Sequence, residues 1–342
     1  DPFAPREPQG IASVGLTAEE VNQAIDRGRE YLVAALQEAV DSQFYDSVDN
    51  GTNQYPLMLL AIHYADGLEQ SEWYRSYVNR FINEHDPRAW TNTYVRGIIL
   101  MLLAAQPNPD LEIIRDHAEA LVWSQYGDGS WGYGSSSPPV PEGEEPEGEA
   151  DEQDPILEID PAAIPDPDPD SDDFDPRVLQ STERPNAERS GGDNSVTQYA
   201  ILGLFAAQQA GLEIDEQVWS QVEQLTRARQ NPDGGWGYTT AWSYGSMACA
   251  GVTILALAQE VAGDDWRTDR AIIEGLRWLD QNFSASSHPP RKGEAAFYYW
   301  SYSYERVGRL LGLEFLGRHE WYPPGARALV DRQQEDGSWL GS

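Results

Sequence analysis

One short motif, present three times, constrains this chain more than any other feature. It has the form Gln-x3-Gly-x-Trp and occupies residues 125–131, 230–236 and 333–339 of the 342-residue sequence. Each copy follows a segment of helical periodicity. Glycine frees the backbone for a tight turn there, and the Gln and Trp side chains can hold the junction. A turn repeated in this way indicates a repeat protein, in which each unit buries its apolar face against the next.

Helical patterns fill the segments between these turns. Thr17 and Glu20 form a capping box, which starts a first helix that extends to about residue 38. Further helices are expected over residues 54–65, 73–83, 91–105, 111–124, 193–207, 216–229, 244–261, 268–282, 294–316 and 324–332. The sequence therefore predicts an all-α protein.

The spacing of the turns predicts the architecture. Weaker copies of the turn begin at residues 43, 84 and 281, so the chain has six turns in all. Six helical hairpins with the more apolar helices inside predict an (α/α)6 toroid. Only three residues follow Trp339, so a sixth inner helix has no sequence of its own here. We expect a truncated ring, an open ring, or a gap filled by another segment.

The predicted domain organisation is a single toroid with two additions. Residues 1–16 are rich in Pro and Gly and predict an irregular arm before the toroid domain of residues 17–342. Residues 135–190 interrupt the repeats with 18 acidic residues against 3 arginines and many prolines. Such a segment lacks the apolar content to fold alone, so we expect an insertion on the surface.

The amino-acid composition limits the kinds of partner that the protein can bind. A formal net charge of -34 argues against nucleic acid and against an anionic membrane surface, because both require clustered basic residues. Lys292 is the only lysine, which fits adaptation to salty water or simply solubility. No uninterrupted apolar run reaches the length of a membrane span, so no transmembrane segment is expected. Asp1 in place of Met suggests a processed N-terminus, which favours a periplasmic or secreted location over the cytoplasm.

The three motifs on alternating helices resemble the repeats of squalene-hopene cyclases and of protein prenyltransferase β subunits. The resemblance covers residues 17–342. The segments 193–207, 230–251 and 333–339 look most like planctomycete-type bacterial proteins built from prenyltransferase and squalene oxidase repeats. The resemblance implies the toroid fold and an isoprenoid as ligand.

The sequence lacks residues that the chemistry of each of these two families requires. Class II terpene cyclases protonate an alkene with the middle acid of an Asp-x-Asp-Asp motif, and the resemblance places this motif at residues 193–196. Asp193 remains, but Ser195 stands at the proton-donor position, and a serine cannot protonate an unactivated alkene. Prenyltransferases hold zinc with Asp, Cys and His. Cys249 is the only thiol, no histidine has ligand spacing to it, and we expect no metal or other cofactor.

Polar residues on the inner helices are the candidates for lining a central cavity. Asp193 is either a helix cap or a catalytic acid. Arg96 lies in an otherwise apolar helix, so it either binds a ligand or forms a structural ion pair. Trp242 and Tyr244 precede an inner helix and are expected at the cavity mouth.

The densest aromatic run, residues 297–306, supplies the other candidates. Helical spacing groups Tyr298, Tyr302 and Glu305 on one face and Tyr299 with Arg306 on another. One face is expected to line the cavity, although such rings also form ordinary cores. The catalytic candidates are Asp193, Tyr302 and Glu305, and the ligand-binding candidates are Arg96, Trp242, Tyr244, Tyr298, Tyr299, Trp300 and Arg306.

Three functions remain open, and the sequence does not decide whether the protein is an enzyme. The first is a terpene-cyclase-like toroid that binds or transforms a polyprenyl or triterpenoid ligand in an aromatic cavity. The second is a non-catalytic scaffold that binds another protein. The third is a polysaccharide lyase or glycan-binding toroid, in which Tyr298 or Tyr302 acts as base while Arg96 or Arg306 neutralises a uronate.

Overall fold

The computed structural model describes residues 6–41, 54–65, 71–83, 87–135, 178–179, 186–239, 242–290 and 296–341. Over these residues the protein is all-α, as predicted. The helices are α1 (Ala18–Asp41), α2 (Tyr55–Tyr64), α3 (Glu72–Asn83), α4 (Thr93–Ala104), α5 (Leu111–Ser124), α6 (Asn194–Gln209), α7 (Glu216–Ala228), α8 (Gly245–Ala262), α9 (Arg270–Asn282), α10 (Phe297–Leu310) and α11 (Tyr322–Val330).

Short polar caps set where several helices begin. Thr17 and Glu20 form the predicted capping box, since the Glu20 carboxylate accepts from the Thr17 amide at 2.8 Å. Other helices begin after a side chain that accepts a hydrogen bond from the first turn, which satisfies donors that have no partner inside the helix. These caps are Asn92, Asp110, Asp193, Asp215 and Asp269.

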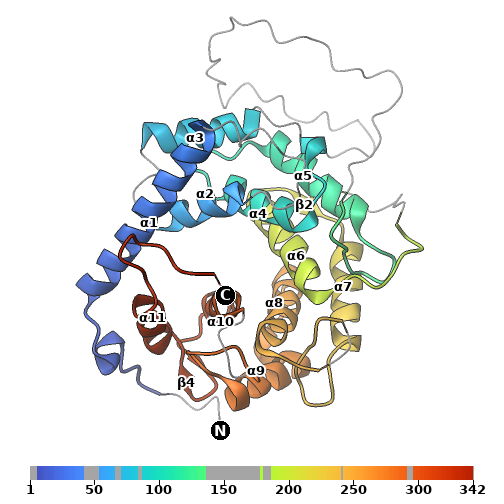
Figure 1. Ribbon diagram of the computed structural model, residues 1–342. Helices are drawn as coiled ribbons and strands as arrows, with labels where there is room; N and C mark the ends of the chain where they lie inside the picture. The colour runs from blue at the N-terminus through green and yellow to red at the C-terminus, as the bar shows by residue number, and fades with distance from the viewer. Residues whose placement is uncertain are drawn as a thin grey trace, which may run out of the picture.

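The even-numbered helices form a continuous series, in which α2 packs on α4, α4 on α6, α6 on α8 and α8 on α10. We call these the inner helices. The odd-numbered helices pack against them, with α5 on α4 and α6, and with α7 and α9 on α8. Figure 1 shows the helices following one another along a curve, which brings α1 beside α11.

Glycines bring two inner helices into backbone contact. A Cβ on Gly97 of α4 would collide with the carbonyl of Tyr199 on α6, and one on Gly203 would lie 2.7 Å from the Gly97 Cα. No larger residue fits at either position without separating the helices. The close approach places the side chains at the start of α4 and α6 next to one another.

The three motif copies make the same contacts. Each Gln amide donates to the carbonyl of the motif's own Gly and to a carbonyl on the next outer helix, namely Val218, Ala271 and Ala24. Each Trp indole donates to a carbonyl ten residues earlier, at 2.7, 2.7 and 2.9 Å. Each Gly has a left-handed φ of +88°, +90° or +89°. The third copy joins α11 to α1, the last helix to the first.

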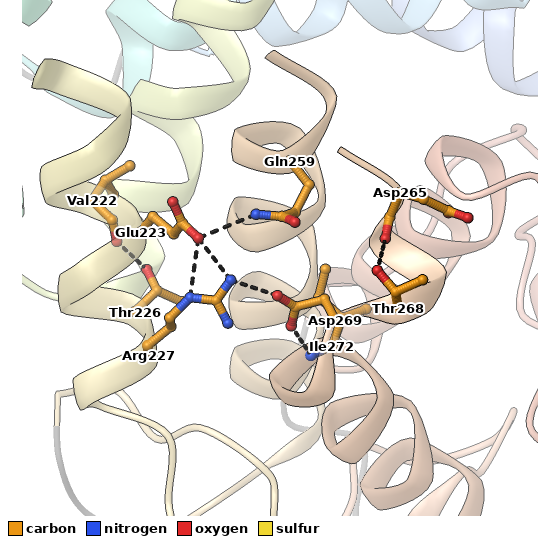
Figure 2. A network of polar contacts seen from close by, with 9 residues as sticks. All are labelled: Val222, Glu223, Thr226, Arg227, Gln259, Asp265, Thr268, Asp269 and Ile272. Carbon is orange, nitrogen blue, oxygen red and sulfur yellow. Dashed lines mark hydrogen bonds and ion pairs between the residues drawn. The ribbon is translucent and has the colours of Figure 1, made fainter. Parts of the chain in front are cut away.

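Outer helices are also joined by a polar network at one end. Arg227 of α7 donates to Glu223 on its own helix and to Asp269, the cap of α9 (Figure 2). The amide of Gln259 on α8 donates to the same Glu223 oxygen at 3.1 Å. The guanidinium is thus shared between two carboxylates, and the network ties α7, α8 and α9 together.

One sequence prediction fails at the end of α10. The helix expected over residues 294–316 ends at Leu310, and a hairpin of β3 (Phe315–Leu316) and β4 (His319–Glu320) follows. Gly312 and Gly317 both have a φ of +62°, which is outside the helical region. The Asp280 carboxylate of α9 accepts from the Arg318 amide at 2.6 Å and holds the hairpin against that helix.

Short regular elements occur in the described parts of both additions to the repeats. The arm contains a 3-10 helix, η1 (Ile11–Val14), which packs on α11. Within the segment predicted as an insertion, β1 (Val178–Leu179) pairs in parallel with β2 (Glu213–Ile214), and Leu179 is buried. The remainder, residues 136–177 and 180–185, lies outside the described residues, as does the turn predicted at 43–49.

Helix α8 bears on the expectation of no transmembrane segment and is consistent with it. Among the described helices, it alone has the length and apolar composition of a membrane span, with 18 residues. Most of it is buried between α6, α7, α9 and α10. A soluble core helix passes the same test, so this is weak support for a membrane span.

Candidate functional site

Three hydroxyl groups from three inner helices meet between α4, α6 and α10. The Tyr94 hydroxyl lies 3.0 Å from Ser195 Oγ and 3.1 Å from the Tyr299 hydroxyl, and Ser195 Oγ lies 2.8 Å from the Tyr299 hydroxyl. We call this set the hydroxyl triangle. Each hydroxyl can donate one hydrogen bond and accept another, so the three groups can satisfy one another.

The surroundings keep these phenols protonated. Burial raises the pKa of Tyr94 and that of Tyr299, and burial likewise raises the pKa of the neighbouring Tyr199. A phenol with a raised pKa is a hydrogen-bond donor near neutral pH and a poor base. Ser195, at the position of the cyclase acid, is only 7% exposed and bonded to two such phenols. The triangle therefore contains neither a strong acid nor a ready base.

Aromatic rings extend from the triangle. The Tyr199 ring stacks on Tyr94 with a centroid distance of 3.9 Å, which the close approach of α4 and α6 at Gly97 permits. On α10 the guanidinium carbon of Arg306 lies 4.3 Å from the centre of the Tyr302 ring, a cation–π geometry. We call Tyr94, Ser195, Tyr199, Tyr299, Tyr302 and Arg306 the central cluster.

One face of α10 supplies three members of this cluster. Tyr299, Tyr302 and Arg306 are three, then four, residues apart, which places them on one side of a helix. The sequence grouping had separated Tyr302 from Arg306, and that grouping is wrong, because the two side chains stack. Tyr299 and Arg306 both reach α4, where the Arg306 Nη1 atom lies 3.6 Å from Met101 Sδ.

Arg306 has few polar contacts. A thioether sulfur is a weak acceptor, and the buried Nε atom has no hydrogen-bond partner among the described residues. Burial lowers the pKa of the Arg306 guanidinium, while the nearby Tyr199 opposes that change. The site therefore holds a part-buried cation beside an aromatic ring.

Arg96 has a different environment from the one that a ligand-binding residue needs. It is completely buried, and its guanidinium donates to the Ser135 hydroxyl at 3.1 Å and to the carbonyls of Pro87 and Trp90. Its Nη1 atom also lies 3.2 Å from Nδ1 of His117. These contacts fix the turn before α4 and favour a structural role, through hydrogen bonds in place of the expected ion pair, over a ligand role.

Asp193 acts as a helix cap in this structure. Its carboxylate accepts from the Val196 amide at 2.9 Å, and burial raises its pKa. Tyr238, which shares a 2.6 Å hydroxyl contact with Tyr133, also donates towards this carboxylate. Both tyrosines are partly exposed, so Asp193 lies just inside the surface at the start of α6.

The remaining catalytic candidates do not converge with Asp193. Glu305 forms a 3.7 Å ion pair with Arg309 along α10, and burial raises the pKa of its carboxyl. Tyr302 instead stacks with Arg306. Asp193, Tyr302 and Glu305 therefore belong to three separate sets of contacts.

The other aromatic candidates divide between core and surface. Trp300 is fully buried, and its indole donates to the Ser284 carbonyl at 2.8 Å, so it is a core residue. Tyr298 contacts the ring of Phe297. Tyr244 precedes α8 and contacts His288 edge-on, whereas Trp242 is 89% exposed.

Sequence reasoning missed Tyr94 and Tyr199 and treated Ser195 only as a lost acid. A signal was present, because each tyrosine lies within one turn of a glycine in an apolar helix, Gly97 or Gly203. Cys249 is buried in the core, and burial raises the pKa of its thiol. In the part of the chain that the structure describes, no group of three or more His, Cys, Asp or Glu residues is placed to hold a metal ion.

Comparison of the chain with models of protein families, with curated proteins and with solved structures finds no match. The case for function therefore depends on the central cluster itself.

Proposed function

We propose that this chain is an (α/α)6-type toroid whose central cluster binds an isoprenoid. Two observations support the toroid. The inner helices pack in series, and three identical turns join neighbouring outer helices. The third turn and η1 link α11 to the N-terminal part of the chain, which is where a sixth inner helix was expected.

The observation that supports this class of ligand is the hydroxyl triangle, whose hydrogen bonds are satisfied within the triangle. Its three hydroxyls bond to one another, so the rings of Tyr94 and Tyr299 can offer apolar surface to a ligand. Tyr199 and Tyr302 extend this aromatic lining. Aromatic faces with few fixed polar groups suit an apolar molecule of the polyprenyl or triterpenoid type.

The proposed activity is binding without protonation of the ligand. Ser195 cannot serve as an acid, and the raised tyrosine pKa values keep the cluster neutral apart from Arg306. A resident cation also disfavours a carbocation in the same space, because like charges repel in a medium of low dielectric constant. The chain's own residues would orient the ligand and exclude water.

A protein-interaction scaffold is the second candidate, and one observation favours it. Side chains of α10 contact those of α4 directly, through Tyr299 with Tyr94 and Arg306 with Met101. Such contacts can also fill the interior as an ordinary core. A glycan lyase receives less support, because Arg96 is committed to backbone carbonyls and the central phenols are poor bases.

A thermal-shift screen tests these alternatives. The purified protein is heated with farnesol, squalene, neutral oligosaccharides or uronic oligosaccharides at two salt concentrations. A ligand that binds only the folded state raises the midpoint. We expect a shift with the isoprenoids, reduced in Tyr199→Leu and retained in the control Tyr322→Leu, which alters a half-exposed outer ring. A shift with glycans alone would contradict the isoprenoid proposal, and no shift with any ligand would favour the scaffold.

A further inference from the structure

Arg306 is unusual among the arginines of this acidic protein. The chain has 57 acidic residues against 23 basic ones, and arginines elsewhere pair readily with carboxylates. Arg227 contacts both Glu223 and Asp269 (Figure 2), and Arg229 lies 3.6 Å from Asp128. No carboxylate of the described residues lies within ion-pair distance of Arg306, although its side chain is part-buried and its Nε atom is fully buried.

The nearest acid in sequence is directed elsewhere. Glu305 pairs with Arg309, whose side chain is 69% exposed. Arg306 instead contacts a sulfur atom and an aromatic face, and its Nε hydrogen has no acceptor among the residues that the structure describes. A desolvated guanidinium without an oxygen acceptor is costly, so a protein interior normally supplies one. The fold leaves that role open beside the hydroxyl triangle.

We propose that Arg306 binds the carboxylate of an apolar organic acid whose hydrocarbon body lies against the central tyrosines. This inference rests on the proposed function and narrows its ligand to an isoprenoid acid. The paired N–H groups of a planar guanidinium match the two oxygens of a carboxylate. The Tyr302 ring under the guanidinium holds its plane in position.

The charge balance selects a carboxylate rather than a diphosphate. One guanidinium balances one negative charge. The next cation along α10, Arg309, is already paired with Glu305 and largely exposed. A net charge of -34 further repels a multiply charged ligand. A ligand with a single negative charge and an apolar body meets both conditions.

The test compares ligands that share one chain and differ in the head group. Isothermal titration measures binding of farnesoic acid, farnesol and farnesyl diphosphate, with palmitic acid as an acid of a different hydrocarbon class. For the wild type we expect farnesoic acid to bind at least about tenfold more tightly than farnesol. Arg306→Met should reduce that ratio to about one, whereas the control Arg309→Met should keep it.

Each other outcome has a definite meaning. Equal wild-type affinity for farnesoic acid and farnesol would overturn the carboxylate inference and leave isoprenoid binding standing. Tight binding of palmitic acid with none of farnesol or farnesoic acid would support the carboxylate and overturn the isoprenoid. Tighter binding of the diphosphate would overturn the single-charge reasoning, and no binding of any probe would overturn both proposals.

A second variant keeps the inference testable if Arg306→Met fails to fold. Arg306→Lys keeps the charge but cannot form the two parallel hydrogen bonds, so we expect an intermediate preference for the acid. The melting temperature of Arg306→Met without ligand should equal or exceed that of the wild type, because a part-buried charge without an acid partner is removed. A large fall would show a structural role and contradict the inference.

Discussion

The two interior arginines of α4 and α10 have opposite surroundings. Arg96 donates to a hydroxyl and two carbonyls and lies against His117, so the fold supplies its acceptors. Arg306 has a sulfur atom and an aromatic ring. The first arrangement is that of a structural residue, and the second leaves hydrogen-bonding capacity for another molecule. An arginine in an apolar helix is therefore assigned by its acceptors and not by its burial.

Replacing each arginine by Met should produce the largest difference in stability between the two environments. Arg96→Met leaves the carbonyls of Pro87 and Trp90 and the Ser135 hydroxyl without their buried donor. We expect a loss of about 3 kcal/mol or more in the free energy of unfolding. Arg306→Met should cause no loss. Urea denaturation of both variants measures the difference, and similar losses would remove the distinction between the two sites.

The Arg96 region should also respond to pH through His117. Burial, followed by the Arg96 charge, lowers the pKa of His117 to about 3 from its ordinary 6.5. In the unfolded chain His117 binds a proton near pH 6.5, but in the folded chain it stays neutral at that pH. The stability of the fold therefore falls as the pH drops below 6.5. Between pH 7 and pH 5 the loss is about 2 kcal/mol. Urea denaturation across this range measures it.

His117→Asn is the matched control, because the Asn amide oxygen can still accept from Arg96 but does not titrate. The difference in stability between wild type and variant should shrink by that amount as the pH falls. Carboxyls with raised pKa values, such as those of Asp193 and Glu305, act in the opposite direction in both proteins and cancel. A pH-independent difference would show that His117 titrates normally.

Much of the fold was predictable from local signals. Helical periodicity, the capping box at Thr17 and the repeated turn were sufficient to predict most helices to within a few residues. The hairpin after α10 was not predicted, since it depends on Asp280, a residue of another helix. Likewise the pairing of β1 with β2 joins residues far apart in sequence. Local patterns carry no information on such contacts.

The central cluster was only partly predictable, for a related reason. The aromatic run identified Tyr299, Tyr302 and Arg306 as candidates, but not their shared face. The role of Ser195 depends on tyrosines contributed by two other helices. Asp193 and Arg96 were ambiguous in the sequence, because a cap and a catalytic acid, or a structural and a ligand-binding arginine, have the same residue type.

A smaller change in stability is expected within the hydroxyl triangle. Its hydroxyls bond to one another, in contrast to Arg306, whose Nε atom has no acceptor among the described residues. Ser195→Ala and Tyr299→Phe should each cost about 1 kcal/mol, the usual value of a buried hydrogen bond. The double variant should cost less than the sum, because both changes remove the same 2.8 Å bond. Thermal unfolding of all four proteins gives the coupling energy. Additive losses would mean that the two hydroxyls act independently.

The smallest change in stability is expected at Glu305. A variant there tests whether the carboxylate next to Arg306 in sequence affects Arg306. Glu305 and Arg309 are partly exposed and 3.7 Å apart, so solvent screens their attraction. Glu305→Gln should change the free energy of unfolding by less than about 0.5 kcal/mol and leave the preference for an acid ligand unchanged. Urea denaturation and titration with farnesoic acid measure both. A stronger acid preference in Glu305→Gln would show that this carboxylate competes for Arg306, and the cation would then be less isolated than its contacts indicate.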